Sequence, residues 1–310
     1  MSFGKVIQLN TGATIPEIGL GTCSDQNKVE SAVEIAVRNG YRHLDLAMIY
    51  QNQDEVGRAL KKVILSVVTR EQLFITSKLW NCSHQQGPAE AELDETLKQL
   101  GLTYLDLYLV HWPVAFEPGH GLRPSHPTKE GEAYLDLKTS LVKSIGVSNF
   151  TIEHIQGLID ATGVAPAVNQ IEAHPLLPQD DLAAYCKQVG VHITAYSPLG
   201  NNGVGKPMLT ENVVVKEVAE KLGATPAQVL VAWGVYRGYS VIPKSVQEGR
   251  IISNFKQIAL SKEDYEKVTA IGAPGNFERF NIPFRYIPKW DINLFDDELE
   301  KTATYRVNIV

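Results

Sequence analysis

Short apolar runs alternate with longer amphipathic stretches along most of the chain, and this alternation restricts the possible folds more than any other feature. A short apolar run is typical of a buried strand, whereas apolar residues at helical spacing are typical of an amphipathic helix. Eight runs fit strands, and nearly all are followed by a helical pattern; they cover residues 18–21, 43–47, 73–80, 105–113, 142–150, 167–175, 192–200 and 239–245. This order predicts an α/β protein with a parallel sheet covered by helices.

The length of 310 residues fits either two domains or one large barrel. Because the composition does not change between the two halves, a single (β/α)8 TIM barrel spanning residues 1–310 is favoured over a two-domain doubly wound fold. The run VIQLNTGATIPEI precedes the first unit and predicts a β-hairpin that turns at residues 10–12 and plugs the bottom of the barrel. The C-terminal residues are expected to form a loop over the active-site mouth.

Charge and cysteine usage exclude several classes of protein. Lys plus Arg number 29 against 35 for Asp plus Glu. The net charge of −6 therefore offers no excess of positive charge to bind a nucleic-acid backbone. No apolar run is long enough for a signal-peptide core or a membrane span. Three scattered cysteines, none in a C-x-x-C pair, argue against disulfides and against a cysteine metal site. We therefore expect a cytoplasmic protein without metal, nucleic-acid or membrane partners.

Four titratable residues lie at or beyond consecutive predicted strand ends. Asp45, Lys78 and His111 end the second, third and fourth strands, and Tyr50 follows Asp45 by five residues. In a barrel these strand ends meet at one mouth, where active sites lie. Each residue alone could be structural, as a buried Asp–Lys pair, a core histidine or a packing tyrosine. Together they predict a catalytic group.

The chemistry of this group suits protonation of a developing alkoxide. A lysine ammonium about 4 Å from a tyrosine phenol would favour the phenolate by at most ~4 kcal/mol, or roughly three pKa units. Asp45 would hold Lys78 in place and keep it charged, and a neutral His111 could donate a hydrogen bond to a carbonyl oxygen. The set contains neither a nucleophile with its base nor a metal cluster, so a hydride donor must come from elsewhere.

Long motifs in a fixed order resemble the aldo-keto reductases. They are GYRHLDLAMIYQNQDEVG, SKLW, LDLYLVHWP, IGVSNF, NQIEAHP, AYSPLG, VIPKSV and RIISNF, and the resemblance extends over residues 3–295. Within that family the chain is most similar to fungal aldehyde reductases and NADP-dependent glycerol dehydrogenases. The resemblance implies a monomer that binds NADPH or NADP⁺ and acts on a small carbonyl or polyol substrate.

The resemblance also assigns a role to particular residues. Tyr50 would donate the proton, Lys78 and Asp45 would adjust the pKa of Tyr50, and His111 would orient the carbonyl. The residues implied to contact the cofactor are Gly21, Thr22, Ser148, Asn149, Gln170, Tyr196, Ser197, Leu199, Lys244, Ser245, Arg250 and Asn254. Among these, Ser148, Asn149 and Gln170 would hold the carboxamide, and Tyr196 would stack on the nicotinamide.

Two cations predict a preference for NADPH over NADH. Lys244 precedes the last predicted helix and Arg250 lies inside it, where Ser245 could cap the first turn. A 2′-phosphate is their natural partner, although two solvated surface cations are the alternative. Ser253 stands where many relatives carry an acidic residue near the adenine.

The residues implied to contact the substrate are Cys23, Trp80 and Trp112. Cys23 stands where many members of the family place a tryptophan, so the aromatic wall is expected to be incomplete. The pattern does not distinguish aldehydes, sugars and polyols as substrates.

Two alternative functions remain from the sequence. A metal-dependent barrel hydrolase would need paired histidines such as H-x-H on the first strand, and the chain has none there. A non-enzymatic barrel related to the reductases, such as a channel subunit, is the more serious alternative, although the intact set of four residues argues against it.

The connection between the fourth and fifth strands departs most from the family. Residues 114–142 are rich in Pro and Gly at first, and the helix that relatives carry before the fifth strand is missing. We expect the segment from Glu132 to Lys143 to substitute as a short helix that turns Tyr134, Leu137 and Leu141 toward the barrel, with Lys138 intruding on that face. The alternative is a truncated variant that folds poorly and has little activity.

Overall fold

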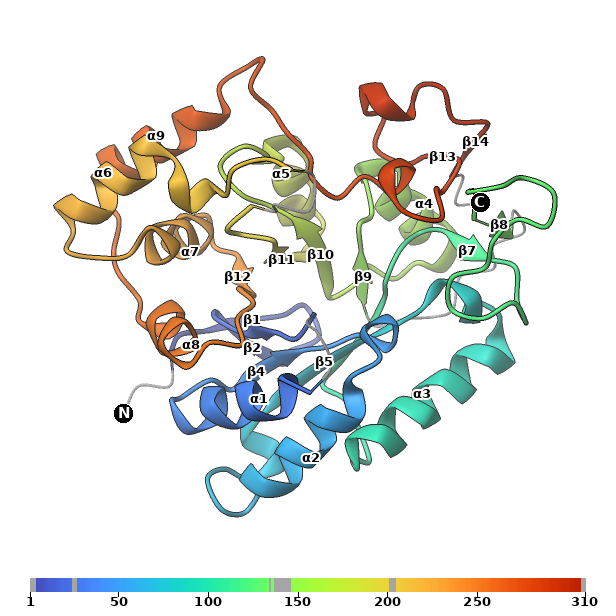
Figure 1. Ribbon diagram of the computed structural model, residues 1–310, viewed down its shortest axis with the longest axis horizontal. Coiled ribbons are helices and arrows are strands. Elements are labelled where there is room, and N and C mark those ends of the chain that lie inside the picture. Colours follow the sequence, from blue (N-terminus) through green and yellow to red (C-terminus); the bar gives the residue numbers. More distant parts are fainter. Residues whose placement is uncertain (1–3, 24–26, 134, 137–145, 201–204, 308–310) are drawn as a thin grey trace.

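Eight parallel strands form a single sheet in the computed structural model, which describes residues 4–23, 27–133, 135–136, 146–200 and 205–307 (Figure 1). The strands are β3 (Leu20–Gly21), β4 (His43–Asp45), β5 (Phe74–Leu79), β6 (Leu107–Val110), β9 (Gly146–Ser148), β10 (Val168–Glu172), β11 (His192–Tyr196) and β12 (Ser240–Val241). They neighbour one another in chain order, as expected for a barrel.

The two edges of the sheet meet and close it. Parallel bridges join Ile18 to Val241 and Gly21 to Lys244. The amide of Gly19 donates to the carbonyl of Val241 at 2.9 Å. A Cβ at Gly19 would lie 2.6 Å from the ring of His43, so this close approach requires glycine. The predicted (β/α)8 barrel is confirmed.

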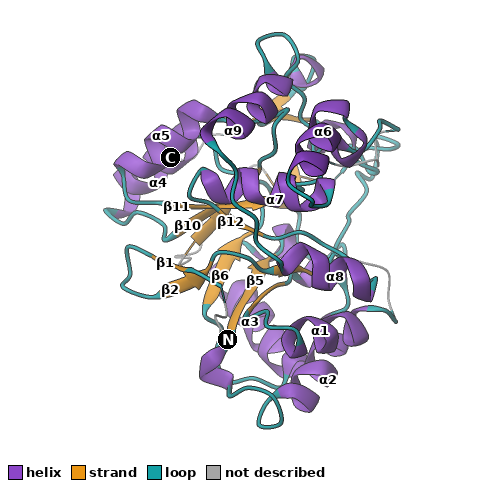
Figure 2. Ribbon diagram, turned by 90° about the vertical axis from the view of Figure 1, so that its left-hand side faces the viewer, coloured by secondary structure: helices purple, strands orange, loops and turns teal. Residues whose placement is uncertain are grey.

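Helices surround the strands (Figure 2). They are α1 (Val29–Arg38), α2 (Gln53–Val63), α3 (Gln86–Leu100), α4 (Ile152–Thr162), α5 (Asp180–Gln188), α6 (Val213–Lys221), α7 (Pro226–Tyr236), α8 (Glu248–Phe255) and α9 (Lys262–Thr269). The apolar residues of α1 that repeat at helical spacing are fully buried in the main core. Because α9 follows α8, α8 is not the last helix, contrary to the sequence-based expectation. No described helix has the length and apolar character needed to cross a membrane.

An N-terminal hairpin closes the bottom of the barrel, as predicted. β1 (Val6–Gln8) pairs antiparallel with β2 (Thr14–Pro16), and Ile7 lies opposite Ile15. Ile15 is completely buried and packs in one cluster with side chains from β5, β6 and β10. The hairpin therefore seals the end of the barrel opposite the strand C-termini.

The connection between β6 and β9 has no helix in its described residues, 111–133 and 135–136. Instead β7 (Ala115–Phe116) pairs antiparallel with β8 (Leu135–Asp136). The predicted helix from Glu132 to Lys143 is wrong over its described part. The chain is extended in this part because the backbone of β8 pairs with β7, and the backbone of Glu132 forms a parallel bridge with Lys289. Tyr134, Leu137, Lys138 and Leu141 lie outside the described residues.

The C-terminal segment packs beside this connection (Figure 1). It contains β13 (Ile292–Asn293), which pairs in parallel with β14 (Tyr305–Arg306). Trp290 and Leu294 from this segment share a buried cluster with residues that follow β5 and β6. The segment thus supplies part of the wall above the C-terminal ends of the strands.

Candidate active site

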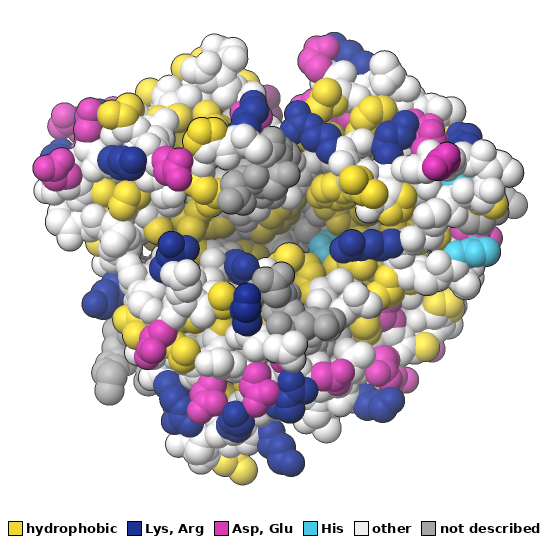
Figure 3. Space-filling model, in the orientation of Figure 1, with side chains coloured by type: hydrophobic (Ala, Val, Ile, Leu, Met, Phe, Trp, Pro, Cys, Tyr) yellow, Lys and Arg dark blue, Asp and Glu magenta, His cyan; other side chains and the backbone are white. Residues whose placement is uncertain are grey.

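A cavity of about 1120 Å³ opens at the C-terminal ends of the barrel strands. Figure 3 shows this hollow at the centre of the molecule, with apolar side chains inside and Lys and Arg side chains at its rim. Most of the predicted site residues line it, namely Gly21, Thr22, Cys23, Asp45, Tyr50, Trp80, His111, Trp112, Ser148, Asn149, Gln170, Tyr196, Ser197, Leu199, Lys244 and Arg250. Lys78, Ser245 and Asn254 do not line it.

Asp45 and Lys78 form a buried ion pair beneath the cavity. The Nζ of Lys78 lies 2.6 Å from Oδ1 of Asp45 and also donates to the carbonyl of Leu46 at 2.6 Å. The other carboxylate oxygen of Asp45 accepts from Nε2 of Gln170 at 2.6 Å. Burial lowers the pKa of Lys78, and Asp45 opposes that change. Both charges are therefore fixed in position by short bonds rather than by solvent.

Tyr50 lies on a 3-10 turn (Met48–Tyr50) that follows β4. Gln51, directly after it, has a left-handed backbone, which ends the turn and directs the chain into α2. The Nζ of Lys78 is 5.4 Å from the centre of the Tyr50 ring. Burial raises the pKa of Tyr50 well above its ordinary value, and Asp45 raises it further. The expected lowering by Lys78 is wrong for this structure, because burial outweighs the attraction of the ammonium.

His111 contacts the tyrosine through its ring. The two ring centres are 6.0 Å apart in an edge-to-face arrangement, and the ring of Trp80 meets His111 edge-on at 5.2 Å. Burial lowers the pKa of His111 well below its ordinary value, and Lys78 adds to this effect. The imidazole is therefore neutral at physiological pH and can donate one hydrogen bond.

Three side chains, from the end of β9 and from β11, form a continuous polar network with the backbone of β10. The amide nitrogen of Asn149 donates to the carbonyl of His111 at 2.9 Å and to Oγ of Ser148 at 3.2 Å. The hydroxyl of Tyr196 donates to Oδ1 of Asn149 at 2.7 Å, and Ser148 donates to the carbonyl of Gln170 at 2.8 Å. Asn149 has a positive φ of 65°, which asparagine tolerates better than most residues. The sequence-predicted amide group is thus assembled in one place.

The residues from β3 and β11 lie along the same cavity. The hydroxyl of Thr22 donates to the carbonyl of Asp45 at 2.8 Å, which anchors the end of β3 to the ion pair. Ser197, after β11, has a positive φ of 49°. The chain therefore bends at Ser197, and Leu199 and Gly200 continue along the cavity wall.

The two predicted phosphate-binding cations lie after β12. Lys244 and Arg250 are exposed and line the cavity. Ser245 does not cap the first turn of α8 as predicted, because α8 begins at Glu248 and Oγ of Ser245 accepts from the amide of Gln247 at 3.1 Å. Asn254 is buried inside α8.

Aromatic side chains form the wall opposite β11 and β12, and three of them, Phe116, Tyr286 and Trp290, were missed from the sequence. Trp80 and Trp112 are buried and line the cavity as predicted, and Cys23 lines the same cavity and is exposed. Trp290 meets Trp112 edge-on at 5.3 Å and Phe116 at 4.9 Å. The cavity-lining residues that the sequence did not suggest are Ile49, Gln51, Phe116, Arg123, Gly200, Met208, Ile242, Asn281, Tyr286, Ile287, Pro288 and Trp290. The only signal for Trp290 was its type, a tryptophan in a Pro-rich segment.

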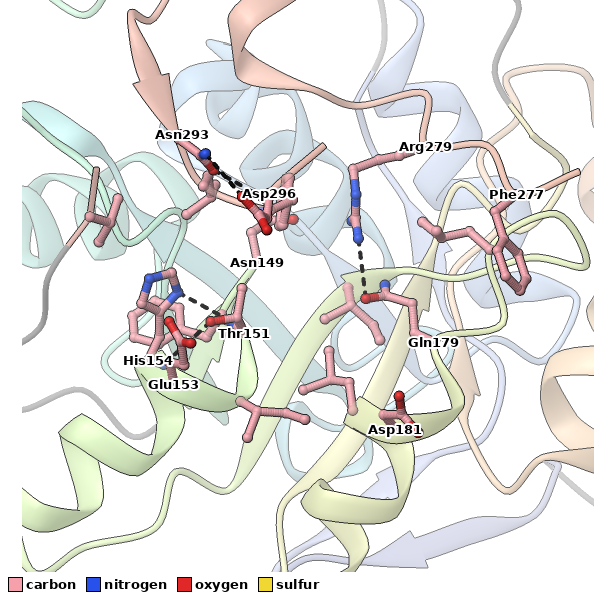
Figure 4. A pocket seen from close by; sticks show the side chains of 18 of the residues that line it. Asn149, Thr151, Glu153, His154, Gln179, Asp181, Phe277, Arg279, Asn293 and Asp296 are labelled. Carbon is pink, nitrogen blue, oxygen red and sulfur yellow. Dashed lines mark hydrogen bonds between the residues drawn. The ribbon is translucent and has the colours of Figure 1, made fainter. Parts of the chain in front are cut away.

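A second cavity of about 640 Å³ lies behind Asn149, where the C-terminal segment covers the starts of α4 and α5 (Figure 4). Arg279 crosses it and donates to Oε1 of Gln179 at 3.3 Å, and its guanidinium lies 3.8 Å from the ring centre of Phe295. Thr151 caps α4 by accepting from the amide of His154. The cavity has no counterpart among the sequence predictions.

Within the described residues no cluster of histidine, cysteine and carboxylate side chains could hold a metal ion. The three cysteines are free. The site is therefore built from the buried ion pair, the tyrosine, the histidine and the amide network.

Comparison with known proteins gives consistent matches. The model of the aldo/keto reductase family matches residues 17–273. The chain is 48% identical to the D/L-glyceraldehyde reductase of Hypocrea jecorina, with 98% of each chain covered. It is 44% identical to the glycerol 2-dehydrogenase (NADP(+)) of Saccharomyces cerevisiae, over 86% of this chain and 90% of that one.

Two solved structures have the same fold. The aldose reductase of Schistosoma japonicum superposes with a TM-score of 0.82 and 38% identity, covering 90% of this chain and 95% of that chain. The aldo-keto reductase of Bombyx mori in complex with NADP superposes with a TM-score of 0.78 and 32% identity, covering 93% and 98%.

Proposed function

The chain belongs to the aldo/keto reductase family, and we propose that it reduces aldehydes or ketones with NADPH, or oxidises polyols such as glycerol with NADP⁺. Tyr50 acts as the general acid. The observation that carries this proposal is the arrangement of Asp45, Lys78, Tyr50 and His111 at the base of one cavity. The names of the relatives, a glyceraldehyde reductase and an NADP⁺-dependent glycerol dehydrogenase, support the substrate class.

The residues that line the cavity fit a nicotinamide dinucleotide. Asn149 and Gln170 present amide groups on the β9–β10 side of the cavity, and Lys244 and Arg250 present cations after β12. We assign the first pair, with Ser148, to the carboxamide, and the cations to the 2′-phosphate. Tyr196 lies between these groups on β11 and offers its ring to the nicotinamide. When bound, NADPH supplies the hydride that adds to the carbonyl carbon.

The protein's own residues control the proton. The raised pKa of Tyr50 keeps its phenol protonated at physiological pH, so the proton is present when the carbonyl oxygen becomes negative. An alkoxide is a stronger base than a phenolate, so transfer from Tyr50 is favourable even from a high pKa. Lys78, held by Asp45, stabilises the phenolate that remains. Neutral His111 donates a hydrogen bond to the carbonyl oxygen and orients it.

The aromatic wall of Trp80, Trp112 and Trp290 excludes water from the reacting carbonyl. Such exclusion strengthens the hydrogen bonds that Tyr50 and His111 make to the oxygen. The C-terminal segment that carries Trp290 completes this wall. We therefore propose that residues 1–310 act as one barrel domain with this segment over the mouth. We also propose that the protein is a cytoplasmic monomer, and its three free cysteines support a reducing compartment.

A combined binding and turnover measurement tests the proposed function. NADPH fluorescence should shift on titration with the protein, and oxidation of NADPH should require both protein and aldehyde. Binding without turnover would instead support a non-catalytic barrel. A panel of glyceraldehyde, xylose, glycerol and an aromatic aldehyde, compared by kcat/KM, then ranks the substrates.

A further inference from the structure

Arg123 is a cation at the cavity that the proposed reaction does not use. It lies on the connection between β7 and β8, is exposed to solvent and lines the 1120 Å³ cavity. The preceding residue is anchored, because Nε1 of Trp80 donates to the carbonyl of Leu122 at 2.5 Å. Trp80 is 4% exposed and belongs to the aromatic wall. The backbone beside Arg123 is thus fixed to the wall that faces the reacting carbonyl.

The topology places Arg123 across the barrel from the two cations assigned to the cofactor. Lys244 and Arg250 follow β12, whereas Arg123 lies on the connection that leaves β6. In the closed ring of eight strands, β6 and β12 are four positions apart, which is diametrically opposite. A phosphate held by Lys244 and Arg250 therefore lies on the other side of the mouth from Arg123.

Arg123 shares one cavity with the proposed catalytic residues. Tyr50 and His111 line this cavity together with Arg123. A substrate whose carbonyl lies at Tyr50 and His111 can therefore extend toward the guanidinium without leaving the cavity.

The charge of Arg123 is not neutralised within the described part of the chain. Arg123 forms no ion pair or side-chain hydrogen bond among the described residues. Asp45 is the single acid among the described residues that line the cavity, and its two oxygens are taken by Lys78 and Gln170. An anion that enters beside the aromatic wall would thus meet an unpaired guanidinium and, among the described lining residues, no unpaired carboxylate.

We propose that Arg123 is a specificity-determining residue that binds a carboxylate or phosphate on the substrate, several bonds from the carbonyl. The preferred substrates are then anionic aldehydes or ketones. A guanidinium is suited to this role because its planar fork pairs with both oxyanions through two parallel hydrogen bonds. The inference rests on the proposed carbonyl reduction and adds a substrate class to it.

Two matched pairs of substrates test the proposal. 4-Carboxybenzaldehyde and 4-nitrobenzaldehyde have the same shape but differ in charge, and glyceraldehyde 3-phosphate and glyceraldehyde differ by the phosphate. The variants are Arg123→Gln, which removes the charge, and Arg123→Glu, which reverses it. Arg38→Gln, on the outer face of α1, is the control because it removes another exposed guanidinium, one that lies away from the cavity.

We expect Arg123→Gln to reduce kcat/KM about tenfold more for the anionic member of a pair than for the neutral member, mostly through KM, as for an exposed charged hydrogen bond. Arg123→Glu should enlarge the ratio of the loss for the anionic member to the loss for the neutral member, and Arg38→Gln should leave this ratio at about one. Added salt should reduce the preference of the wild type but not that of Arg123→Gln. A loss confined to one pair identifies carboxylate or phosphate as the group recognised.

Equal losses for both members of each pair, or no loss, would overturn the proposal while leaving the carbonyl reduction intact. Failure of the proposed function gives a different result, which is no turnover of any aldehyde. The role of Arg123 is then decided by equilibrium binding of 4-carboxybenzaldehyde, followed by quenching of tryptophan fluorescence. About tenfold weaker binding to Arg123→Gln than to the wild type supports the assignment, and equal binding refutes it.

Discussion

The Nζ of Lys78 lies 2.6 Å from Oδ1 of Asp45, and the side chains are 0% and 2% exposed. A pair this deeply buried is costly to separate, because the remaining charge keeps neither its partner nor water. The surroundings of Tyr50 depend on the pair, since the Nζ of Lys78 lies 5.4 Å from the centre of its ring and Asp45 ends the strand that precedes it.

Removing one partner should therefore destabilise the fold as well as abolish turnover. We expect Lys78→Met to reduce the free energy of unfolding by about 3–5 kcal/mol, measured by urea titration, because Asp45 remains buried with Gln170 alone. The double variant Lys78→Met, Asp45→Asn should recover part of the stability and none of the activity. A double variant no more stable than Lys78→Met alone would contradict this account.

Tyr50→Phe tests the source of the proton. The substitution removes one hydroxyl and keeps the ring that meets His111 edge-on. Turnover should fall by about 10²–10⁴-fold, the usual contribution of general acid catalysis, while NADPH binding stays as in the wild type. If the variant keeps more than about a tenth of the wild-type kcat, another group delivers the proton.

The sequence predicted that the four candidate catalytic residues lie together because their positions follow from the fold alone. Asp45, Lys78 and His111 end or follow consecutive strands, so the barrel brings them together without knowledge of any loop. The pKa values of these residues could not be predicted from their positions in the fold. The expected effect of Lys78 on Tyr50 was attraction between charges, whereas the structure adds the burial of the phenol, which dominates and raises its pKa.

The loops were the least predictable part. Trp290 reaches the cavity from a segment without strand or helix periodicity, and Arg123 follows a Pro- and Gly-rich run that has no pattern of its own. The segment near Glu132 has apolar residues at helical spacing, yet its described part is extended because backbone partners on two sides favour a strand. Backbone pairing with distant segments therefore outweighs the helical spacing of the apolar residues.

Glu92 should make the stability depend on pH. It lies in α3, is 8% exposed and accepts from the amide of Trp80 at 2.7 Å. Burial raises its pKa from 4.5 to about 7. Below pH 4.5 the carboxyl of Glu92 is protonated in both the folded and the unfolded state, so it does not reduce the free energy of unfolding. As the pH rises to about 7, the unfolded state ionises first, so up to ~3 kcal/mol of stability is lost.

The variant Glu92→Gln isolates this effect. Its amide oxygen can accept from Trp80 but cannot ionise, so its stability should exceed that of the wild type increasingly between pH 5 and 8. Buried histidines such as His84, whose pKa is lowered to about 4, reduce the stability of the protein as the pH falls. They do so equally in the wild type and in Glu92→Gln, so they do not change the difference between the two. Urea titrations at several pH values give the difference. A constant difference would show that Glu92 does not titrate in this range.

Arg250 should determine the choice between NADPH and NADH. Its guanidinium lines the cavity from α8, on the same side as Lys244 and across the barrel from Arg123. A 2′-phosphate is present in NADPH and absent in NADH, so a charged hydrogen bond to it contributes to one cofactor alone. Arg250→Ala should weaken NADPH binding by about 1.5–3 kcal/mol, or roughly 10- to 100-fold, and leave NADH nearly unchanged. Fluorescence titration with each cofactor measures the two losses. Arg38→Gln serves again as the control for loss of an exposed cation, and equal losses for NADPH and NADH would show that Arg250 does not contact the phosphate.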